Sequence, residues 1–275
     1  MVSNFHLPPS GFGPGSQPLE DELGYMAFPS GMRTFAPQLP AVDDPSAVAP
    51  ALGALAEMAA SCDRCVESDR TASLDLSGLT GPARRLVAET LGEGEVSMQI
   101  RGRAARAVQE SVFAGIWQVL GAGIDRVEIA PVPAAALAAF EPARPAAGLQ
   151  APKTPGMGNA PALLVELLDK SAAWAPGTAP HVVNLTLLPH SESDLAWLDA
   201  ALGEGVVTIL SRGYGNCRIT ATATQHVWRV QFFNSMDALI LDTFEVTDMP
   251  EVALAAPEDL SDSARRLREV MEAIR

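Results

Sequence analysis

Positive charge is scarce in this 275-residue chain, which has 19 Lys and Arg residues against 33 Asp and Glu residues. The resulting net charge of −14 argues against a nucleic-acid binder, because such a protein needs a cationic surface to displace phosphate counterions. An acidic surface instead favours a basic partner, mainly through faster encounter. The alternative is that the charge only keeps the protein soluble.

The sequence also lacks segments that direct proteins into or across membranes. It has no apolar run long enough to cross a bilayer, so we expect no membrane insertion. The first Lys or Arg is Arg33, so the N-terminus lacks the basic region of a secretory or twin-arginine signal. We therefore expect a cytoplasmic protein.

Reactive residues are few and scattered. Three cysteines, an odd number, do not describe a disulfide framework. Four histidines (His6, His181, His190 and His226) show no metal-ligand spacing, and the G-x-S-x-G turn of hydrolases does not occur. No nucleophile, base and oxyanion donors come together in the sequence. We therefore expect a protein that is not an enzyme and holds no cofactor.

What the sequence does contain is a repeat with a spacing of 111 residues. The run 91–102, LGEGEVSMQIRG, recurs at 202–213 as LGEGVVTILSRG. In the same register, residues 49–52 match 160–163, and Trp117 matches Trp228. Three separate matches in one register indicate the tandem duplication of one structural unit.

The patterns of both copies predict an α+β fold with two tandem pseudo-symmetric α-β-α-β-β-β repeats, a mixed, largely antiparallel sheet and a C-terminal helix. The first copy is predicted to have helices at 47–60 and 82–91, strands at 73–76, 96–101 and 126–129, and a long strand ending near 119. The second is predicted to have helices at 160–174 and 191–202, strands at 181–188, 207–211 and 239–246, and a long strand ending near 233.

The same patterns divide the chain into five parts. The predicted parts are an irregular Pro/Gly-rich arm at 1–46, the first copy at 47–141, a linker at 142–158, the second copy at 159–256 and an amphipathic helix within 257–275 that begins near Ser261. Trp117 and Trp228 are interpreted as equivalent core residues, and His226 as a hydrogen-bonded histidine on a strand.

Each second helix ends in a Leu-Gly-Glu-Gly run. Gly92 and Gly203 are predicted helix stops, because glycine adopts positive φ without a Cβ clash. The order helix, glycines, strand is the reverse of a phosphate-binding loop, so Glu93 and Glu204 are not interpreted as catalytic. Ser191 and Asp194 predict a capping box at the start of the second helix of copy two.

Cys62 and Cys65 form a Cys-x-x-Cys pair, which is predicted to lie between the first helix and the first strand. This spacing occurs in metal and redox sites, but it supplies two ligands where structural zinc needs four. Copy two lacks the pair. We interpret both residues as ordinary cysteines, with a metal or redox site as the alternative.

The run 212–218, RGYGNCR, is the most distinctive part of the second copy. Its glycines and asparagine predict a tight hairpin. Copy one has RGRAARA at 101–107, so the turn chemistry is present in one copy only. This difference predicts a partner-binding surface with Arg212, Tyr214, Asn216 and Arg218. The alternative is a purely structural hairpin with Cys217 pointing inward.

Several runs of the second copy together resemble a known family. They are HVVNLTLL at 181–188, DLAWL at 194–198, LGEG at 202–205, SRGYGNCRI at 211–219, W-x-V-Q-x-F-N at 228–234 and PEVALAAPEDL at 250–260. The chain from about Leu74 to its C-terminus resembles the hydrogenase expression/formation proteins of the HupH/HyaF/HoxQ type. The resemblance does not include Cys62 and Cys65.

The resemblance implies a non-catalytic, chaperone-like accessory factor in the maturation of membrane-bound [NiFe] hydrogenases, which acts before export of the small subunit. Its expected partners are the small-subunit precursor, which carries iron–sulfur clusters and a twin-arginine signal, and a thioredoxin-like companion. An exposed strand edge or a groove between the copies could hold an extended segment of such a client. Two alternatives stay open: a redox or iron–sulfur-handling protein that uses Cys62, Cys65 and Cys217, and a scaffold that joins maturation factors without touching the precursor.

Overall fold

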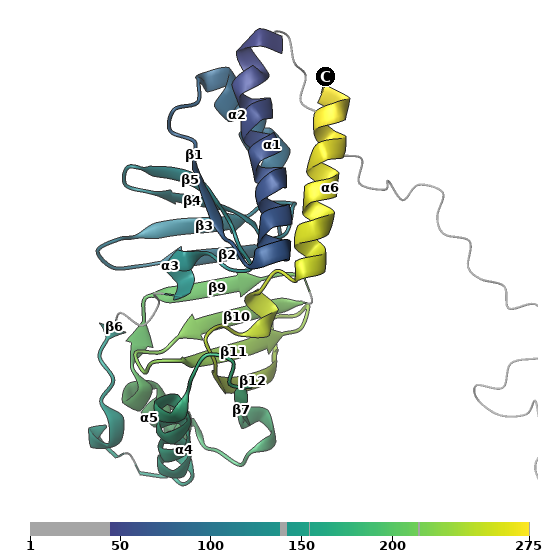
Figure 1. Cartoon of the computed structure of the whole chain (residues 1–275). Coiled ribbons are helices and arrows are strands. Elements are labelled where there is room, and N and C mark those ends of the chain that lie inside the picture. Colours follow the sequence, from purple (N-terminus) through teal and green to yellow (C-terminus); the bar gives the residue numbers. More distant parts are fainter. Residues whose placement is uncertain (1–44, 138–141, 154, 214, 275) are drawn as a thin grey trace, which may run out of the picture. The chain divides into compact units, whose positions relative to one another are not determined.

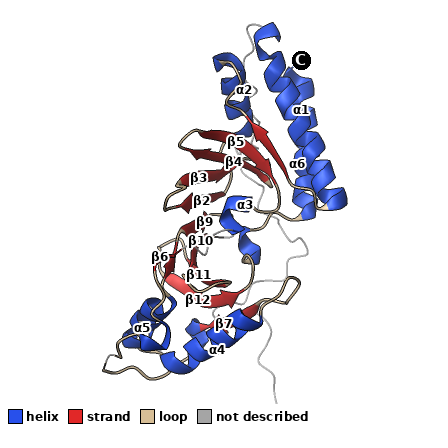
Figure 2. Ribbon diagram, turned by 60° about the vertical axis from the view of Figure 1, so that its left-hand side comes forward, coloured by secondary structure: helices blue, strands red, loops and turns tan. Residues whose placement is uncertain are grey.

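The computed structural model describes residues 45–137, 142–153, 155–213 and 215–274. They form an antiparallel ten-stranded sheet with helices at both ends (Figures 1 and 2). In spatial order the strands are β1 (Ala72–Asp75), β5 (Ile124–Ile129), β4 (Ile116–Gly121), β3 (Arg106–Glu110), β2 (Val96–Ile100), β9 (Val207–Ser211), β10 (Asn216–Ala221), β11 (Val227–Phe233), β12 (Leu239–Val246) and β7 (His181–Asn184). A separate two-stranded sheet pairs β6 (Pro142–Arg144) with β8 (Glu204–Gly205).

The helices gather into two groups. The first consists of α1 (Pro45–Ser68), α2 (Gly81–Leu91) and α6 (Pro257–Ile274), and the second of α4 (Ala160–Ala173) and α5 (Glu192–Leu202). The short helices are α3 (Ala134–Leu137), η1 (Gly148–Gln150), η2 (Leu185–Leu187) and η3 (Glu251–Ala253). None of the helices in the described part of the chain has the length and apolar character needed to cross a membrane.

The two repeats join through β2 and β9, so that five strands from each make one continuous sheet. Next to this ladder the backbone N–H of Arg101 donates to the carbonyl of Val206 at 2.9 Å. The N–H of Arg212 donates to the carbonyl of Glu95 at 3.1 Å. Since these donors and these acceptors are each 111 residues apart, the two bonds are counterparts across a pseudo-two-fold axis. The predicted fold class is therefore confirmed.

Each repeat differs from the prediction in one detail. The predicted long strand is two strands joined by a tight turn, β3 and β4 in the first repeat and β10 and β11 in the second. In the first repeat the Ser111 hydroxyl accepts from the N–H of Phe113 and donates to the carbonyl of the same residue. Thr222 binds Thr224 in the same way in the second repeat. These side-chain bonds stabilise the turns that reverse the chain, and the backbone N–H groups of Ser111 and Thr222 still donate to the carbonyls of Ile116 and Val227. The repeat is therefore α-β-α-β-β-β-β.

Other element bounds also differ from the predictions. Helix α1 continues to Ser68. The strand predicted at 181–188 ends at Asn184, where η2 begins, and α6 begins at Pro257. His226, predicted on a strand, lies in the turn before β11 with a φ of 60°. The predicted N-terminal arm lies outside the described residues, apart from its last two positions.

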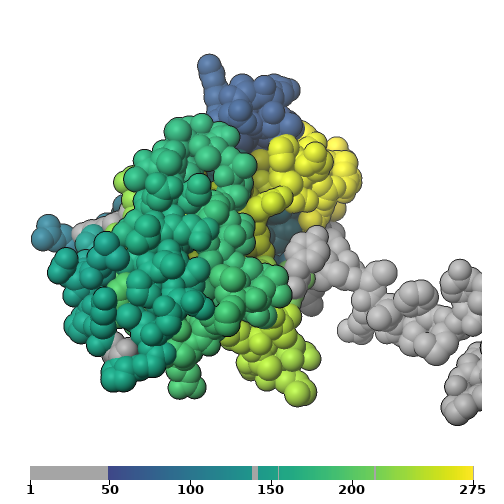
Figure 3. Space-filling view, turned by 90° about the horizontal axis from the view of Figure 1, so that it is seen from below, coloured from purple at the N-terminus to yellow at the C-terminus, as the bar shows by residue number. Residues whose placement is uncertain are grey.

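Both helix groups pack on the same face of the sheet. The first group covers Ile116, Val127 and Ile129, and the second covers Val227 and Phe244. The antiparallel registers place all five side chains on one face, because directly paired residues point to the same side. Seen from below (Figure 3), the teal and green part of the chain, to which the second group belongs, fills most of the visible surface.

The opposite face of the central strands is closed by short segments. Trp117 and Trp228 are fully buried there, in one core cluster with residues of α3 and η3. Their indole N–H groups donate to the carbonyls of Ala130 at 2.9 Å and Thr247 at 3.2 Å. The prediction that both tryptophans are equivalent core residues is confirmed. On the helix-bearing face the two helix groups cover the outer strands, so this face stays open over the central strands.

Candidate functional site

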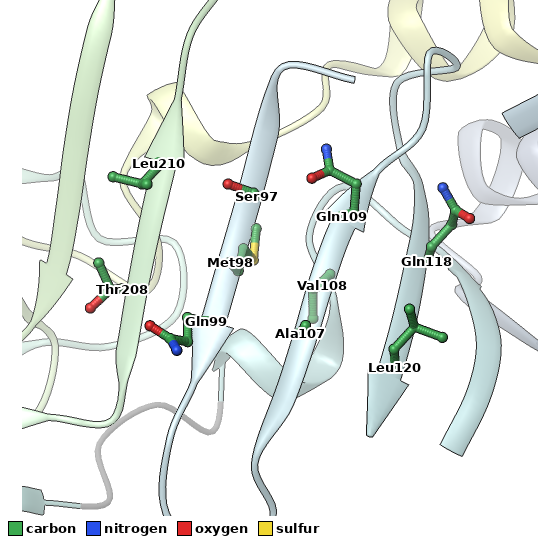
Figure 4. Close-up of a pocket in the computed structure, with 10 residues that line it drawn as sticks. All are labelled: Ser97, Met98, Gln99, Ala107, Val108, Gln109, Gln118, Leu120, Thr208 and Leu210. Carbon is green, nitrogen blue, oxygen red and sulfur yellow. The ribbon is translucent and has the colours of Figure 1, made fainter. Parts of the chain in front are cut away.

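The open part of the sheet carries a shallow groove of about 300 Å³ (Figure 4). Its floor crosses β4, β3, β2 and β9, the strands on both sides of the junction between the repeats. The side chains that point into it are Ser97, Gln99, Ala107, Gln109, Gln118, Leu120, Thr208 and Leu210. This floor mixes amides, hydroxyls and small apolar groups, as expected of a sheet face in contact with solvent.

A second groove of about 580 Å³ continues from the first at Leu210. It lies between the β9–β10 hairpin and the β11–β12 hairpin, at one end of the second repeat's sheet. Its lining residues are Leu210, Ser211, Arg212, Asn216, Cys217, Arg218, Phe233 and Asp237. The two grooves form one open surface across the junction, which we call the sheet groove.

The geometry of the β9–β10 hairpin positions its polar side chains. The guanidinium carbon of Arg218 lies 5.4 Å from the centre of the Phe233 ring, and the amide of Asn216 lies 3.4 Å from a carboxylate oxygen of Asp237. Gly215 has a φ of 98°. A Cβ atom at Gly213 would lie 2.1 Å from a carboxylate oxygen of Glu95, so a side chain there would require the Glu95 side chain to move.

Three of the four sequence-predicted partner-binding residues lie on this groove. Arg212, Asn216 and Arg218 are exposed and line it, whereas Tyr214 lies outside the described residues. Cys217 is buried in the core beneath, as the structural alternative predicted. Sequence reasoning missed Phe233, Asp237 and the floor residues, although the alternation of polar and apolar residues in β2 and β9 could have indicated the floor.

The cysteines do not form one reactive centre. Cys62 and Cys65 lie within α1 rather than in a loop, and both are buried in the core of the first repeat. Cys217 belongs to a different core cluster. Burial, with a contribution from Cys65, raises the pKa of the Cys62 thiol to about 12, and burial raises the pKa of Cys217 to about 12. Such thiols stay protonated near neutral pH, unlike metal-binding or redox-active thiolates.

The described histidines have local structural contacts. His181 lies 2.7 Å from a carboxylate oxygen of Glu166, and the His190 ring lies 2.8 Å from the carbonyl of Leu188. His226 stacks on Trp174 with ring centres 3.6 Å apart. Across the described residues, no three His, Cys, Asp or Glu side chains are grouped as metal ligands. His6 lies outside the described residues.

These features define a class of protein: a duplicated α+β unit that leaves the centre of its shared sheet open. The family description "HupH hydrogenase expression protein, C-terminal conserved region" matches residues 48–149 and again residues 157–274. The chain belongs to this family. That one region matches twice is further support for the tandem repeat.

The similar proteins carry names from hydrogenase formation. "Hydrogenase expression/formation protein HupH" of Rhodobacter capsulatus is 66% identical over 100% of both chains. "Hydrogenase expression/formation protein HoxQ" of Cupriavidus necator is 42% identical over 98% of both chains. "Hydrogenase-1 operon protein HyaF" of Escherichia coli is 33% identical over 98% of this chain and 95% of the relative. The first two names refer to expression and formation of hydrogenases and the third to a hydrogenase operon, and none of them names an enzymatic reaction.

A solved structure is also similar. It is "Hydrogenase expression protein HupH from Thiobacillus denitrificans ATCC 25259", which is 28% identical, with a TM-score of 0.40, and the match covers 42% of this chain and 97% of that chain.

Proposed function

We propose that this chain is a non-catalytic accessory factor in [NiFe] hydrogenase maturation. It binds the small-subunit precursor, with its iron–sulfur clusters and twin-arginine signal, in the cytoplasm before export, and acts beside a thioredoxin-like companion. Membership of a family of hydrogenase expression proteins supports the maturation role. The assignment of the precursor as client is our own step beyond those names.

The observation that carries the proposal is the sheet groove. A sheet face that stays open between two helix groups offers a long surface for another polypeptide. Its floor exposes Gln99 and presents the half-buried Thr208, which supply donors and acceptors beside the apolar side chain of Leu210. Such a mixture suits a client that must later be released, because polar interfaces bind less permanently than apolar ones.

The edges of the sheet give the client a second mode of contact. Strands β1 and β7 are the outermost strands, and each pairs with one neighbour only among the described strands. An extended client segment could add to such an edge by backbone hydrogen bonds. The net charge of −14 also favours encounter with a basic signal peptide.

Native mass spectrometry with the purified small-subunit precursor tests the proposal. We expect a complex with the wild-type chain, and a weaker complex when Arg218 is replaced by Ala together with Asn216 or Tyr214. Arg103→Ala is the matched control, because Arg103 is the exposed repeat-one counterpart of position 214. No complex with the wild-type chain would contradict the proposal, and equal capture by folded groove variants would contradict the assignment of the site.

The companion requires a separate measurement. When the thioredoxin-like protein is added to the same mixture, we expect a three-component complex that contains the precursor. If the companion binds this chain equally well without precursor, and the precursor binds neither, the scaffold alternative is favoured.

A further inference from the structure

We infer that the part of the sheet groove between the two hairpins of the second repeat binds an acidic segment of the client, in which carboxylates adjoin an apolar side chain, and not the twin-arginine signal. This inference rests on the proposed function, because it names the chemistry of the client segment at that site. The pair Arg212 and Arg218, with Phe233 and Leu210 beside them, is called the arginine pocket below.

The first observation is that both arginines of the pocket are exposed and have no ion-pair partner among the described residues. The counterpart of Arg212 in the first repeat, Arg101, lies 2.7 Å from a carboxylate oxygen of Glu204. Arg229, on the neighbouring strand β11, lies 2.7 Å from a carboxylate oxygen of Asp242. In a chain with 33 acidic residues, two arginines that line one groove without ion-pair partners among the described residues form a local cationic site.

The second observation is that the two acidic groups near the pocket form no ion pair with its arginines among the described residues. The carboxylate of Asp237 faces the amide of Asn216 at 3.4 Å. The carboxylate of Glu95 lies against the backbone of Gly213. Neither carboxylate is within ion-pair distance of Arg212 or Arg218 in the described part of the chain, so the donors of both guanidiniums can serve a ligand.

The third observation is that two apolar side chains, Phe233 and Leu210, lie beside the arginines. The guanidinium of Arg218 lies over the Phe233 ring, an arrangement that orients the guanidinium while its N–H edge stays free for a carboxylate. Leu210 is 39% exposed at the junction of the two grooves. An Asp or Glu side chain can bind the arginines in bidentate geometry while a neighbouring apolar residue contacts Leu210.

The first repeat cannot form the same site. Its residues at the positions of Asn216 and Arg218 are Ala105 and Ala107. Its β4–β5 hairpin is also shorter, because Gly121 already pairs with Ile124. We therefore expect one arginine pocket per chain. A twin-arginine segment would bring like charge to this pocket, which disfavours its binding there.

The test uses three blocked peptides and the full-length protein. The acidic peptide is Ac-Ala-Asp-Leu-Glu-Phe-Asp-Ala-NH₂, the amide peptide replaces its acids with Asn and Gln, and the basic peptide replaces them with Arg. Isothermal titration should show one site per chain for the acidic peptide, with affinity that falls as salt rises. We expect the amide peptide and the double variant R212A/R218A each to weaken binding by about tenfold or more.

Controls separate charge, geometry and folding. R103E reverses a charge on the equivalent hairpin and should leave the affinity for the acidic peptide unchanged. R212K/R218K keeps the charge but loses the bidentate fork, so it should bind with intermediate affinity. The far-ultraviolet circular dichroism of each variant reports on folding.

The outcomes are distinct for the two proposals. The inference is overturned if the amide or basic peptide binds as well as the acidic one, or if a folded R212E/R218E variant binds the acidic peptide normally. Either result leaves capture of the precursor by the wild-type chain intact. A wild-type chain that binds the acidic peptide but no precursor would instead contradict the proposed function.

Discussion

Met98 on β2 pairs directly with Ile209 on β9, its own counterpart in the second repeat, 111 residues further along the chain. When a residue pairs with its own counterpart in an antiparallel ladder, the two-fold axis that relates the repeats passes between the two residues. This pair therefore marks the pseudo-symmetry axis of the sheet. Both side chains are buried, in the core cluster beneath the sheet groove. The stability of the junction and the position of the groove therefore depend on the same strands.

Replacing Ile209 with Asp should separate the two repeats. A carboxylate would be buried without a partner on the axis, and we expect the free energy of unfolding to fall by about 3 kcal/mol or more. Urea denaturation measures this change. Gln99→Lys is the control, because Gln99 neighbours Met98 but is exposed on the open face, and we expect it to change stability by no more than about 0.5 kcal/mol. Equal effects would show that the junction is not a buried core.

Removal of the Asp194 carboxylate should destabilise two helices at once. The carboxylate accepts from the backbone N–H of Ser191 at 2.9 Å, within the predicted capping box of α5. It also accepts from the N–H of Gly158 at 2.8 Å and of Ala160, the first residue of α4, at 3.0 Å. Since the charged form receives these bonds, the pKa of Asp194 is held well below its ordinary value. We expect Asp194→Asn to cost about 2 kcal/mol at pH 7.

The destabilisation caused by Asp194→Asn should depend on pH in a defined direction. Because the folded-state pKa of Asp194 is lowered, its contribution to stability is complete above the ordinary pKa of 3.8 and is lost as pH falls through the folded value. The difference between wild type and variant should therefore shrink in acid. Glu192→Gln, an exposed change in the same first turn, should alter stability by less than about 0.5 kcal/mol. A difference that is constant from pH 7 to acid would contradict the capping role.

Glu110 should make the protein less stable as pH rises. It is 7% exposed, and burial raises its pKa to about 7, with smaller contributions from Glu95 and Asp259. Between the ordinary value of 4.5 and about 7 the folded protein binds more protons than the unfolded chain, so stability falls with pH over this interval. Glu110→Gln removes the charge, and we expect it to stabilise the protein at pH 8 by about 2 kcal/mol.

Thermal unfolding of both proteins from pH 5 to pH 8 measures the effect. Glu89→Gln, an exposed change on α2, should leave the pH dependence of the wild type unaltered. If the curves of wild type and Glu110→Gln stay parallel, Glu110 does not titrate in this range.

Much of the fold could be predicted because the duplication repeats each local signal. The Leu-Gly-Glu-Gly runs marked the ends of α2 and α5, and Gly92 and Gly203 indeed have φ values of 53° and 71°. The turn at His226 was missed, because a histidine with positive φ gives no glycine signal. It is the counterpart of Gly115, at which the same conformation is easily adopted.

The site could be predicted only in part, for a related reason. The arginines and asparagine of the β9–β10 hairpin differ from their counterparts in the first repeat, so comparison of the copies found them. Phe233 and Asp237 reach the same groove through the pairing of β10 with β11 and a longer second hairpin. Such tertiary neighbours leave no local pattern. The face of the sheet that would stay open depends on where both helix groups dock, which the sequence does not specify.

The three thiols should resist modification in the folded protein. Burial raises the pKa of Cys62, Cys65 and Cys217, so little thiolate forms near neutral pH. We expect iodoacetamide at pH 7.5 to label none of them rapidly, and all three after unfolding in urea. Fast labelling of Cys62 in the folded protein, or iron or zinc that is lost in Cys62→Ser, would favour the redox or iron–sulfur alternative.

Gly115→Ala should loosen the C-terminal helix from the first repeat. Gly115 has a φ of 79°, and a Cβ atom there would lie 2.3 Å from a methyl group of Leu260 on α6. The neighbouring carbonyl of Ala114 accepts from the Ser263 hydroxyl at 2.9 Å, so α6 packs directly on the turn between β3 and β4. Gly123→Ala is a matched control, because Gly123 has a φ of 71° but nothing within 4 Å of the added atom. In both variants, alanine at a positive φ costs about 1–2 kcal/mol of backbone strain.

The clash with α6 is present in Gly115→Ala alone. We therefore expect it to lower the free energy of unfolding by about 1–3 kcal/mol more than the control does. Hydrogen exchange should locate the loss in α6 and in the part of α1 that packs against it. Because α6 covers the first repeat, while the arginine pocket lies in the second, binding of the acidic peptide should be unchanged in the folded variant. Equal destabilisation by the two substitutions would mean that the turn does not hold the helix.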